Sequence, residues 1–161
     1  MDITTIHVYT DGSLVRKGKQ VFCGYGIYFP NSEYKSVSRK FTHEPITNNR
    51  AELYAILKTI ILCNKVNLQR KLDKKFPVKK VIIYSDSEYS VKTFNIWYQN
   101  WQKSGKEYLN KDIIDEVANA IESVNFKVEF KHVRAHTGKT DPHSIANDIV
   151  DQLAKKGAFR E

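Results

Sequence analysis

The order of strand-like and helix-like segments constrains the fold of this 161-residue chain most strongly. Residues 3–9, 21–29 and 34–41 are rich in β-branched and aromatic residues, which favour strands, and no helical pattern separates them. Asp11-Gly12 predicts the end of the first strand, and Pro30-Asn31-Ser32 predicts a hairpin turn between the second and third. The chain therefore begins with a predicted antiparallel meander.

The rest of the chain alternates helical patterns with short apolar runs. Residues 47–52 open a helix whose apolar residues recur at helical spacing, and the lysine-rich stretch 64–80 predicts a solvated extension of it followed by a loop. The other predicted segments are a strand at 81–84, helices at 88–97 and 100–103, an amphipathic helix at 113–121, a strand at 126–133 and a closing helix at 144–156. This order predicts an α/β fold: a mixed five-stranded sheet, with three antiparallel strands and then parallel βα units, flanked by helices.

Composition indicates one folded domain with an anionic partner. A chain of this length with 41% hydrophobic residues can bury a core, so we predict a single domain over residues 1–161. Its net charge of +8 favours nucleic acid or an acidic membrane surface, although a basic surface without a partner explains the charge equally well. Cys23 and Cys63 lie in apolar stretches without metal-ligand spacing, so we expect reduced core cysteines.

The sequence contains no membrane or export signal that we recognise. No apolar run approaches the roughly 20 residues that span a bilayer. The N-terminus lacks a basic region followed by an apolar run, the pattern of a signal peptide. We therefore expect a protein without a membrane partner, located in the cytoplasm or else in the nucleoid or nucleus.

Four acidic residues stand near the ends of predicted elements. Asp11 and Asp86 each follow an apolar strand, Glu52 lies in the first turn of a helix, and Asp151 lies in the closing helix. Each alone has an ordinary explanation as a turn residue, a capping or dipole interaction, or an exposed helix acid. Together they can converge on one edge of the sheet, where the carboxyl ends of parallel strands meet.

Converging carboxylates predict a metal site. Like charges gathered in one place repel and destabilise the fold unless a cation offsets them. A site with only oxygen ligands suits Mg²⁺ or Mn²⁺ rather than zinc, and Mg²⁺ often takes its remaining ligands from phosphate. Two such ions about 4 Å apart would serve phosphodiester hydrolysis. We therefore predict two Mg²⁺ ions at these acids, with Mn²⁺ as a substitute.

At these residues the sequence resembles the type 1 ribonuclease H family over nearly its whole length. The shared motifs, in the family's order, are Thr10-Asp11-Gly12-Ser13, TNNRAEL at 47–53, Ser85-Asp86-Ser87, VRAHTG at 133–138, and Asn147, Asp151, Leu153 and Ala154. The resemblance implies a ribonuclease H-like fold and a monomeric endonuclease that hydrolyses the RNA strand of RNA–DNA hybrids by two-metal-ion catalysis, leaving 5′-phosphate and 3′-hydroxyl ends. It makes Asp11, Glu52, Asp86 and Asp151 the catalytic metal ligands. The spacing from Asn147 selects Asp151 over Asp148.

The resemblance also assigns roles around the acids. His136 resembles the family's loop histidine, which assists proton transfer or product release, although a lone loop histidine is usually only solvated. Asn48, Asn49 and Asn147 match positions that line the substrate groove, where amides can bond the RNA 2′-hydroxyl. Thr47 resembles a residue that grips a DNA phosphate.

A segment with two tryptophans matches the family's basic protrusion, which contacts the DNA strand. Trp97 and Trp101 are four residues apart and share a helix face, and Lys103 and Lys106 follow. Aromatic faces can stack on sugars or bases while lysines pair with phosphates. The alternative interpretation is that both tryptophans are core residues.

The chain also departs from the family. Residues 14–20 replace a glycine-rich turn, Glu88 stands where an amide often contacts RNA, and residues 64–80 look like an insertion. Two other functions remain open: a related nuclease, such as a junction resolvase or a reverse transcriptase domain, and a non-catalytic nucleic-acid-binding module. The motifs at 48–53 and 85–87 argue against a resolvase, and the four intact acids argue against a pure binding module.

Overall fold

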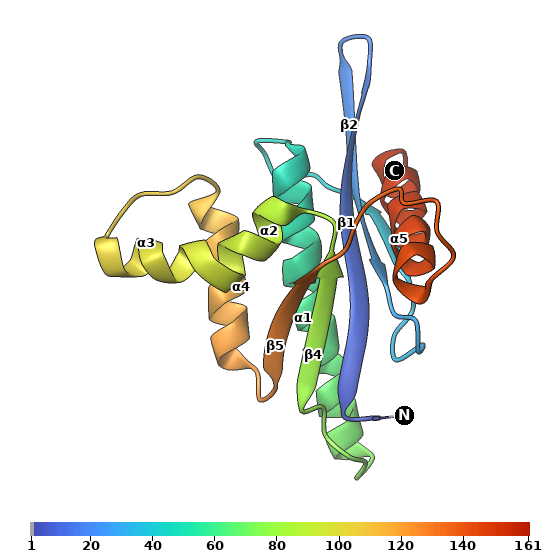
Figure 1. Cartoon of the computed structure of the whole chain (residues 1–161), viewed down its shortest axis with the longest axis vertical. Coiled ribbons are helices and arrows are strands. Elements are labelled where there is room, and N and C mark those ends of the chain that lie inside the picture. Colours follow the sequence, from blue (N-terminus) through green and yellow to red (C-terminus); the bar gives the residue numbers. More distant parts are fainter. Residues whose placement is uncertain (1) are drawn as a thin grey trace.

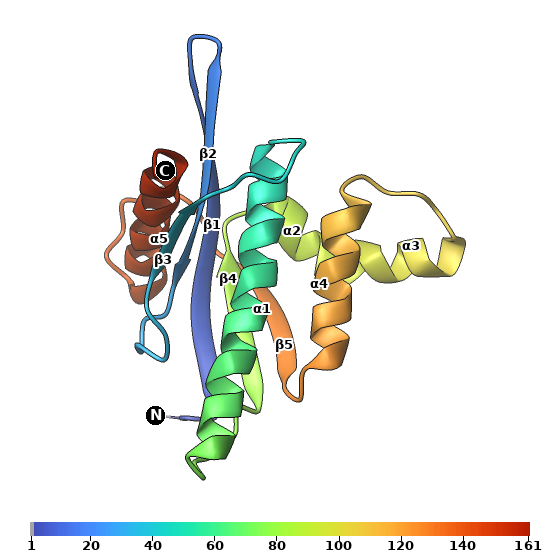
Figure 2. The same ribbon diagram turned by 180° about the vertical axis from the view of Figure 1, so that it is seen from behind.

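The computed structural model describes residues 2–161 and contains one mixed sheet with helices on both faces (Figures 1 and 2). The elements are β1 (Thr5–Lys17), β2 (Gln20–Tyr28), β3 (Val37–Lys40), α1 (Asn48–Leu72), β4 (Lys80–Ser85), α2 (Glu88–Lys92), the π-helical turn η1 (Thr93–Trp97), α3 (Tyr98–Ser104), α4 (Lys111–Ser123), β5 (Lys127–His132) and α5 (Pro142–Ala158). The strand order is β3-β2-β1-β4-β5. β2 runs antiparallel to both neighbours, and β4 runs parallel to both of its own. The predicted fold class is confirmed.

Strand alternation divides the core into two layers. Ile6 and Val8 of β1 point to the face covered by α1 and α4, whereas Tyr9 points to the face covered by α5. Fully buried Ile56 and Ile60 of α1 complete the first layer. Within residues 2–161, none of the helices has both the length and the apolar character needed to cross a bilayer.

The first strand is longer than the sequence predicts. β1 runs through Asp11 and Gly12 to Lys17, so the predicted strand end at these residues is wrong. The turn instead lies at Gly18, which has φ 62°. A Cβ on Gly12 would lie only 2.6 Å from the backbone nitrogen of Glu52. Glycine is therefore needed there for the close approach of α1 to β1, and not for a turn.

Other boundaries also differ from or refine the predictions. β3 covers residues 37–40 and not the whole of 34–41, and residues 29–36 form a broad loop where a tight turn was predicted. The two helices predicted at 88–97 and 100–103 are one continuous run, since η1 joins α2 to α3. α1 extends to Leu72 before its loop, as the lysine-rich stretch predicted.

Candidate active site

Three acidic side chains meet where β4 ends. Asp11 on β1, Glu52 on α1 and Asp86 directly after β4 each offer one oxygen, and these oxygens lie within 4.8 Å of one another. The topology explains the meeting, because parallel pairing of β1 with β4 ends at Thr10 and Ser85, one residue before each aspartate. We call Asp11, Glu52 and Asp86 the carboxylate cluster.

The carboxylate cluster is short of positive charge. Asp11 and Glu52 are each only 3% exposed. Within residues 2–161 no Lys, Arg or His pairs with any of the three acids, and Oε2 of Glu52 is buried without a hydrogen-bond partner. Burial, followed by the nearby charge of Glu52, raises the pKa of Asp11, and burial also raises the pKa of Glu52. These oxygen donors, two of them on buried side chains and one on the half-buried Asp86, include an unpartnered atom and fit a hard divalent cation.

Helix α5 brings two predicted site residues to the cluster. Asn147 is 1% exposed, and its Nδ2 donates to Oδ2 of Asp86 at 3.2 Å. Asp151, one helical turn later, lies close enough to Asp11 to raise the pKa of that acid. It is not one of the three acids within 4.8 Å, and its Oδ2 pairs with Nζ of Lys155 at 3.0 Å. The rival acid Asp148 is exposed.

The start of α1 is organised by its own side chains. Oγ1 of Thr47 accepts a hydrogen bond from the Arg50 backbone nitrogen at 3.1 Å, which caps the helix. Oδ1 of Asn48 accepts from the Leu14 backbone nitrogen at 3.2 Å, whereas Asn49 is exposed. The structure thus ties one predicted substrate-binding amide to the β1–β2 hairpin.

Arg50 has a structural role, because it joins the start of α1 to α4. Its guanidinium is buried and donates to both carboxylate oxygens of Asp112 on α4, at 2.8 Å and 2.9 Å. It also donates to the carbonyl oxygen of Glu44 at 3.2 Å. The arginine of the TNNRAEL motif therefore fixes the end of α1 that carries Glu52.

The histidines fall into two groups. His136 is exposed in the loop between β5 and α5, with φ 50°, and the structure does not bring it into the carboxylate cluster. Nε2 of His132 donates to the Asp86 carbonyl oxygen at 3.2 Å. Nδ1 of His143 bonds the Tyr9 hydroxyl at 2.5 Å. Sequence reasoning missed the contact of His132 with Asp86, because only the pairing of β5 beside β4 creates it.

The tryptophan segment lies on η1 and α3, and α3 projects away from the sheet (Figure 1). The rings of Trp97 and Trp101 lie 6.1 Å apart, so they share a face as predicted, and both are half-buried. The ring of Trp101 stacks on Tyr108 at 4.6 Å. Lys103 and Lys106 are exposed. One face of Trp101 is therefore already occupied by the protein itself.

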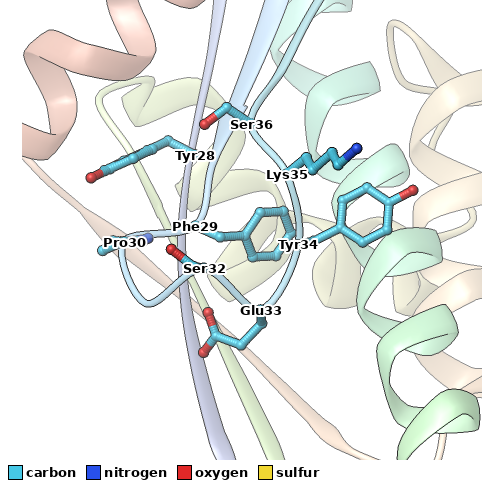
Figure 3. Close-up of a pocket in the computed structure, with 8 residues that line it drawn as sticks. All are labelled: Tyr28, Phe29, Pro30, Ser32, Glu33, Tyr34, Lys35 and Ser36. Carbon is cyan, nitrogen blue, oxygen red and sulfur yellow. The ribbon is translucent and has the colours of Figure 1, made fainter.

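Cavity size does not locate the site. A surface pocket of about 620 Å³ lies in the loop between β2 and β3, lined by Phe29, Glu33 and Tyr34 among others (Figure 3). None of the predicted site residues lines this pocket. The carboxylate cluster is distinguished by its charge and burial.

The comparisons with known proteins agree on one family. The model for the family described as RNase H matches residues 4–159. A protein of Acanthamoeba polyphaga mimivirus named probable ribonuclease H is 37% identical, over 85% of this chain and 58% of its own length. The ribonuclease H of Francisella tularensis subsp. novicida is 31% identical, over 92% of this chain and 87% of its own length.

A solved structure gives the same fold. The foamy viral protease-reverse transcriptase in complex with RNA/DNA hybrid superposes with a TM-score of 0.68 at 20% identity, over 96% of this chain and 20% of that one. At such identity the likeness establishes the fold alone. The chain spans about half the length of several curated relatives.

Proposed function

The chain belongs to the RNase H family, and we propose that it is an endonuclease that hydrolyses the RNA strand of RNA–DNA hybrids. The observation that carries the proposal is the carboxylate cluster, in which one oxygen of each acid lies within 4.8 Å of the others at the end of β4. The similarity to the Francisella ribonuclease H over most of both chains supports the same activity. The foamy viral neighbour, which shares the fold, was solved with an RNA/DNA hybrid, the substrate class that we propose for this chain.

Divalent ions fit the cluster. Asp11, Glu52 and Asp86 would hold them, with Asp151 joining once it releases Lys155. We propose two Mg²⁺ ions, because hard cations prefer carboxylate oxygens and phosphate supplies their remaining ligands. When bound, such ions supply charge stabilisation at the scissile phosphate and lower the pKa of the attacking water. The products would carry 5′-phosphate and 3′-hydroxyl ends.

The neighbouring side chains orient the cluster. Asn147 holds one carboxylate oxygen of Asp86, and His132 holds its backbone carbonyl, so this acid is fixed from both the α5 side and the β5 side. The buried oxygen of Glu52, which has no partner in the described part of the chain, can serve a ligand. We assign to His136 the transfer of a proton to or from the reacting phosphate, for which an exposed loop next to α5 gives access.

Recognition of the hybrid needs contacts with both strands. We assign the 2′-hydroxyl of the RNA strand to Asn48 and Asn49, whose amide groups can both donate and accept. Thr47 and the exposed Lys103 and Lys106 then serve phosphates of the DNA strand. Asn147 is buried and hydrogen-bonded to Asp86, so we assign it the orientation of that acid and no direct contact with the hybrid.

One assay tests the proposal. Labelled RNA–DNA hybrid, duplex RNA and duplex DNA are each incubated with the protein, with and without Mg²⁺. We expect cleavage of the RNA strand of the hybrid alone, only with the ion. Cleavage of a DNA substrate would indicate a different nuclease of the superfamily, and tight binding of the hybrid without cleavage would indicate a binding module.

A further inference from the structure

The hairpin formed by β1 and β2 extends past the carboxylate cluster. The pairing of β1 with β4 ends at Thr10, whereas the pairing of β1 with β2 continues to Lys17 and Gln20. The strand from Asp11 to Lys17 adds about 20 Å to the length of the hairpin. Figures 1 and 2 show the hairpin rising above the helices on both faces of the sheet. The tip thus projects beyond the helices, on the side where β4 ends at Asp86.

The hairpin carries positive charge only. Arg16, Lys17 and Lys19 lie at its tip, and the sequence contains no acid from residue 12 to residue 32. All three side chains are exposed, and within residues 2–161 none of them forms an ion pair. Three unneutralised cations on a narrow ribbon would repel one another, so a polyanion complements this surface.

The hairpin is braced on both of its faces, below the tip at Leu14 and Phe22 and at the tip itself by Lys17. On one face, the Leu14 backbone nitrogen donates to Oδ1 of Asn48 at the start of α1. On the other, the ring of Phe22 packs 4.9 Å from that of Phe159, and Nζ of Lys17 lies 4.7 Å above the same Phe159 ring. The arm therefore has a set direction relative to the carboxylate cluster.

We propose that this hairpin is a phosphate-binding arm that grips the hybrid beyond the cleavage site. The inference rests on the proposed function, and it adds an interaction with the duplex backbone that is distant from the reacting phosphate. Strand length places the tip roughly 20 Å from Asp11, a distance of about six nucleotides along a duplex strand. The arm binds phosphates, so it raises affinity for hybrids long enough to reach it.

The test compares two pairs of charge-neutralising substitutions. Arg16→Gln with Lys19→Gln removes two tip charges and leaves the interaction of Lys17 with Phe159 intact. The matched control is Lys71→Gln with Lys75→Gln, which removes two exposed lysines at and just beyond the far end of α1. Hybrids of about 20 and about 6 base pairs are titrated in EDTA over a range of salt concentrations, and thermal melts check that both variants are folded.

We expect the arm variant to bind the long hybrid on the order of tenfold more weakly at 0.1 M salt. Its log–log salt slope should be reduced by up to about 1.8, since two phosphates are no longer neutralised. The short hybrid and the control variant should behave as the wild type does. An unchanged slope in the folded arm variant overturns the proposal, and so does an equal weakening in the control or on the short hybrid. Binding is measured in EDTA, where no cleavage occurs, so the binding result does not depend on activity. A wild type that fails to cut hybrids would disprove the proposed function but would not change the outcome of this binding test.

Discussion

The carboxylate cluster and the tryptophan segment differ in whether their side chains find interaction partners inside the protein. In the cluster, Asp11 and Glu52 are buried next to each other, and their pKa values are raised. One oxygen of Glu52 has no hydrogen-bond partner among the described residues 2–161. On α3, Trp101 stacks on Tyr108, whose hydroxyl donates to Asp115. Groups that contribute to folding find partners inside the protein. Groups that lack them are candidates for ligand binding.

The largest expected effect concerns the cluster. Asp86→Asn should lower the rate of hybrid cleavage by about three orders of magnitude or more, because the variant lacks a ligand for the ions while the fold and hybrid binding remain. Initial rates with Mg²⁺ measure it. Asp148→Asn, which neutralises an exposed acid on α5, is the matched control and should keep its rate. Near-normal turnover of the Asp86 variant would disprove the assignment of these acids as metal ligands.

His136 tests whether chemistry extends beyond the cluster. His136→Ala should slow turnover by about a hundredfold without abolishing it, since general acid–base assistance typically contributes that much. Initial rates with Mg²⁺, measured on the wild type and the variant across the pH range, check this expectation. If the pH–rate profile is unchanged, His136 is only a solvated loop residue.

A substitution of Trp101 tests whether the tryptophan segment contributes to folding, to hybrid binding or to both. Trp101→Ala removes a half-buried ring that stacks on Tyr108, so we expect the free energy of unfolding to fall by about 1–3 kcal/mol. If its free face also stacks on the DNA strand, KM for the hybrid rises more than kcat falls. Thermal melts and steady-state kinetics on the same variant separate the two contributions. A lower melting temperature with an unchanged KM would place this tryptophan wholly in the core.

Substitution of Lys103 and Lys106 tests hybrid binding by the same segment without disturbing its packing. Both are exposed, so changing both to Ala should leave the melting temperature unaltered. The salt slope of hybrid binding should fall by about 0.9 for each phosphate that the variant no longer neutralises. An unchanged slope would remove the lysines from the binding surface.

The smallest expected effect is on the stability of the metal-free protein. Burial raises the folded-state pKa of Asp11 above its unfolded value, so its contribution to stability is full below about pH 4 and is lost as the pH rises through the folded-state pKa. Asp11→Asn should therefore stabilise the protein in EDTA at pH 8 by about 1–2 kcal/mol, raising its melting temperature by about 2–8 °C. At pH 4 the two proteins should melt alike. Added Mg²⁺ should stabilise only the wild type. A variant that melts lower at pH 8 in EDTA would contradict the predicted cost of burying this acid.

Sequence patterns predicted the architecture well because apolar periodicity and chain order are local properties. The βα alternation after residue 46 predicted the parallel pairing of β1, β4 and β5, and with it the edge where Asp11 and Asp86 meet. Boundaries were predicted less well. Asp11-Gly12 has the composition of a turn, yet it lies inside a strand because α1 packs against the glycine. No local rule could have revealed that packing, since it joins residues about forty positions apart.

By itself, the sequence determined the α/β class, the order of the elements and the acids that belong together, because these follow from periodicity and from motifs at fixed spacing. The tertiary structure alone decided what surrounds each group. In the folded protein, Asn147 and His132 donate hydrogen bonds to Asp86, and Arg50 pairs with Asp112. Tyr108 covers one face of Trp101. The tertiary structure also makes residues 14–20 part of a projecting hairpin. These contacts join residues that are far apart in the sequence. Which of the possible partners a polar group or a ring contacts depends on how the whole chain packs, and local sequence patterns do not specify that packing.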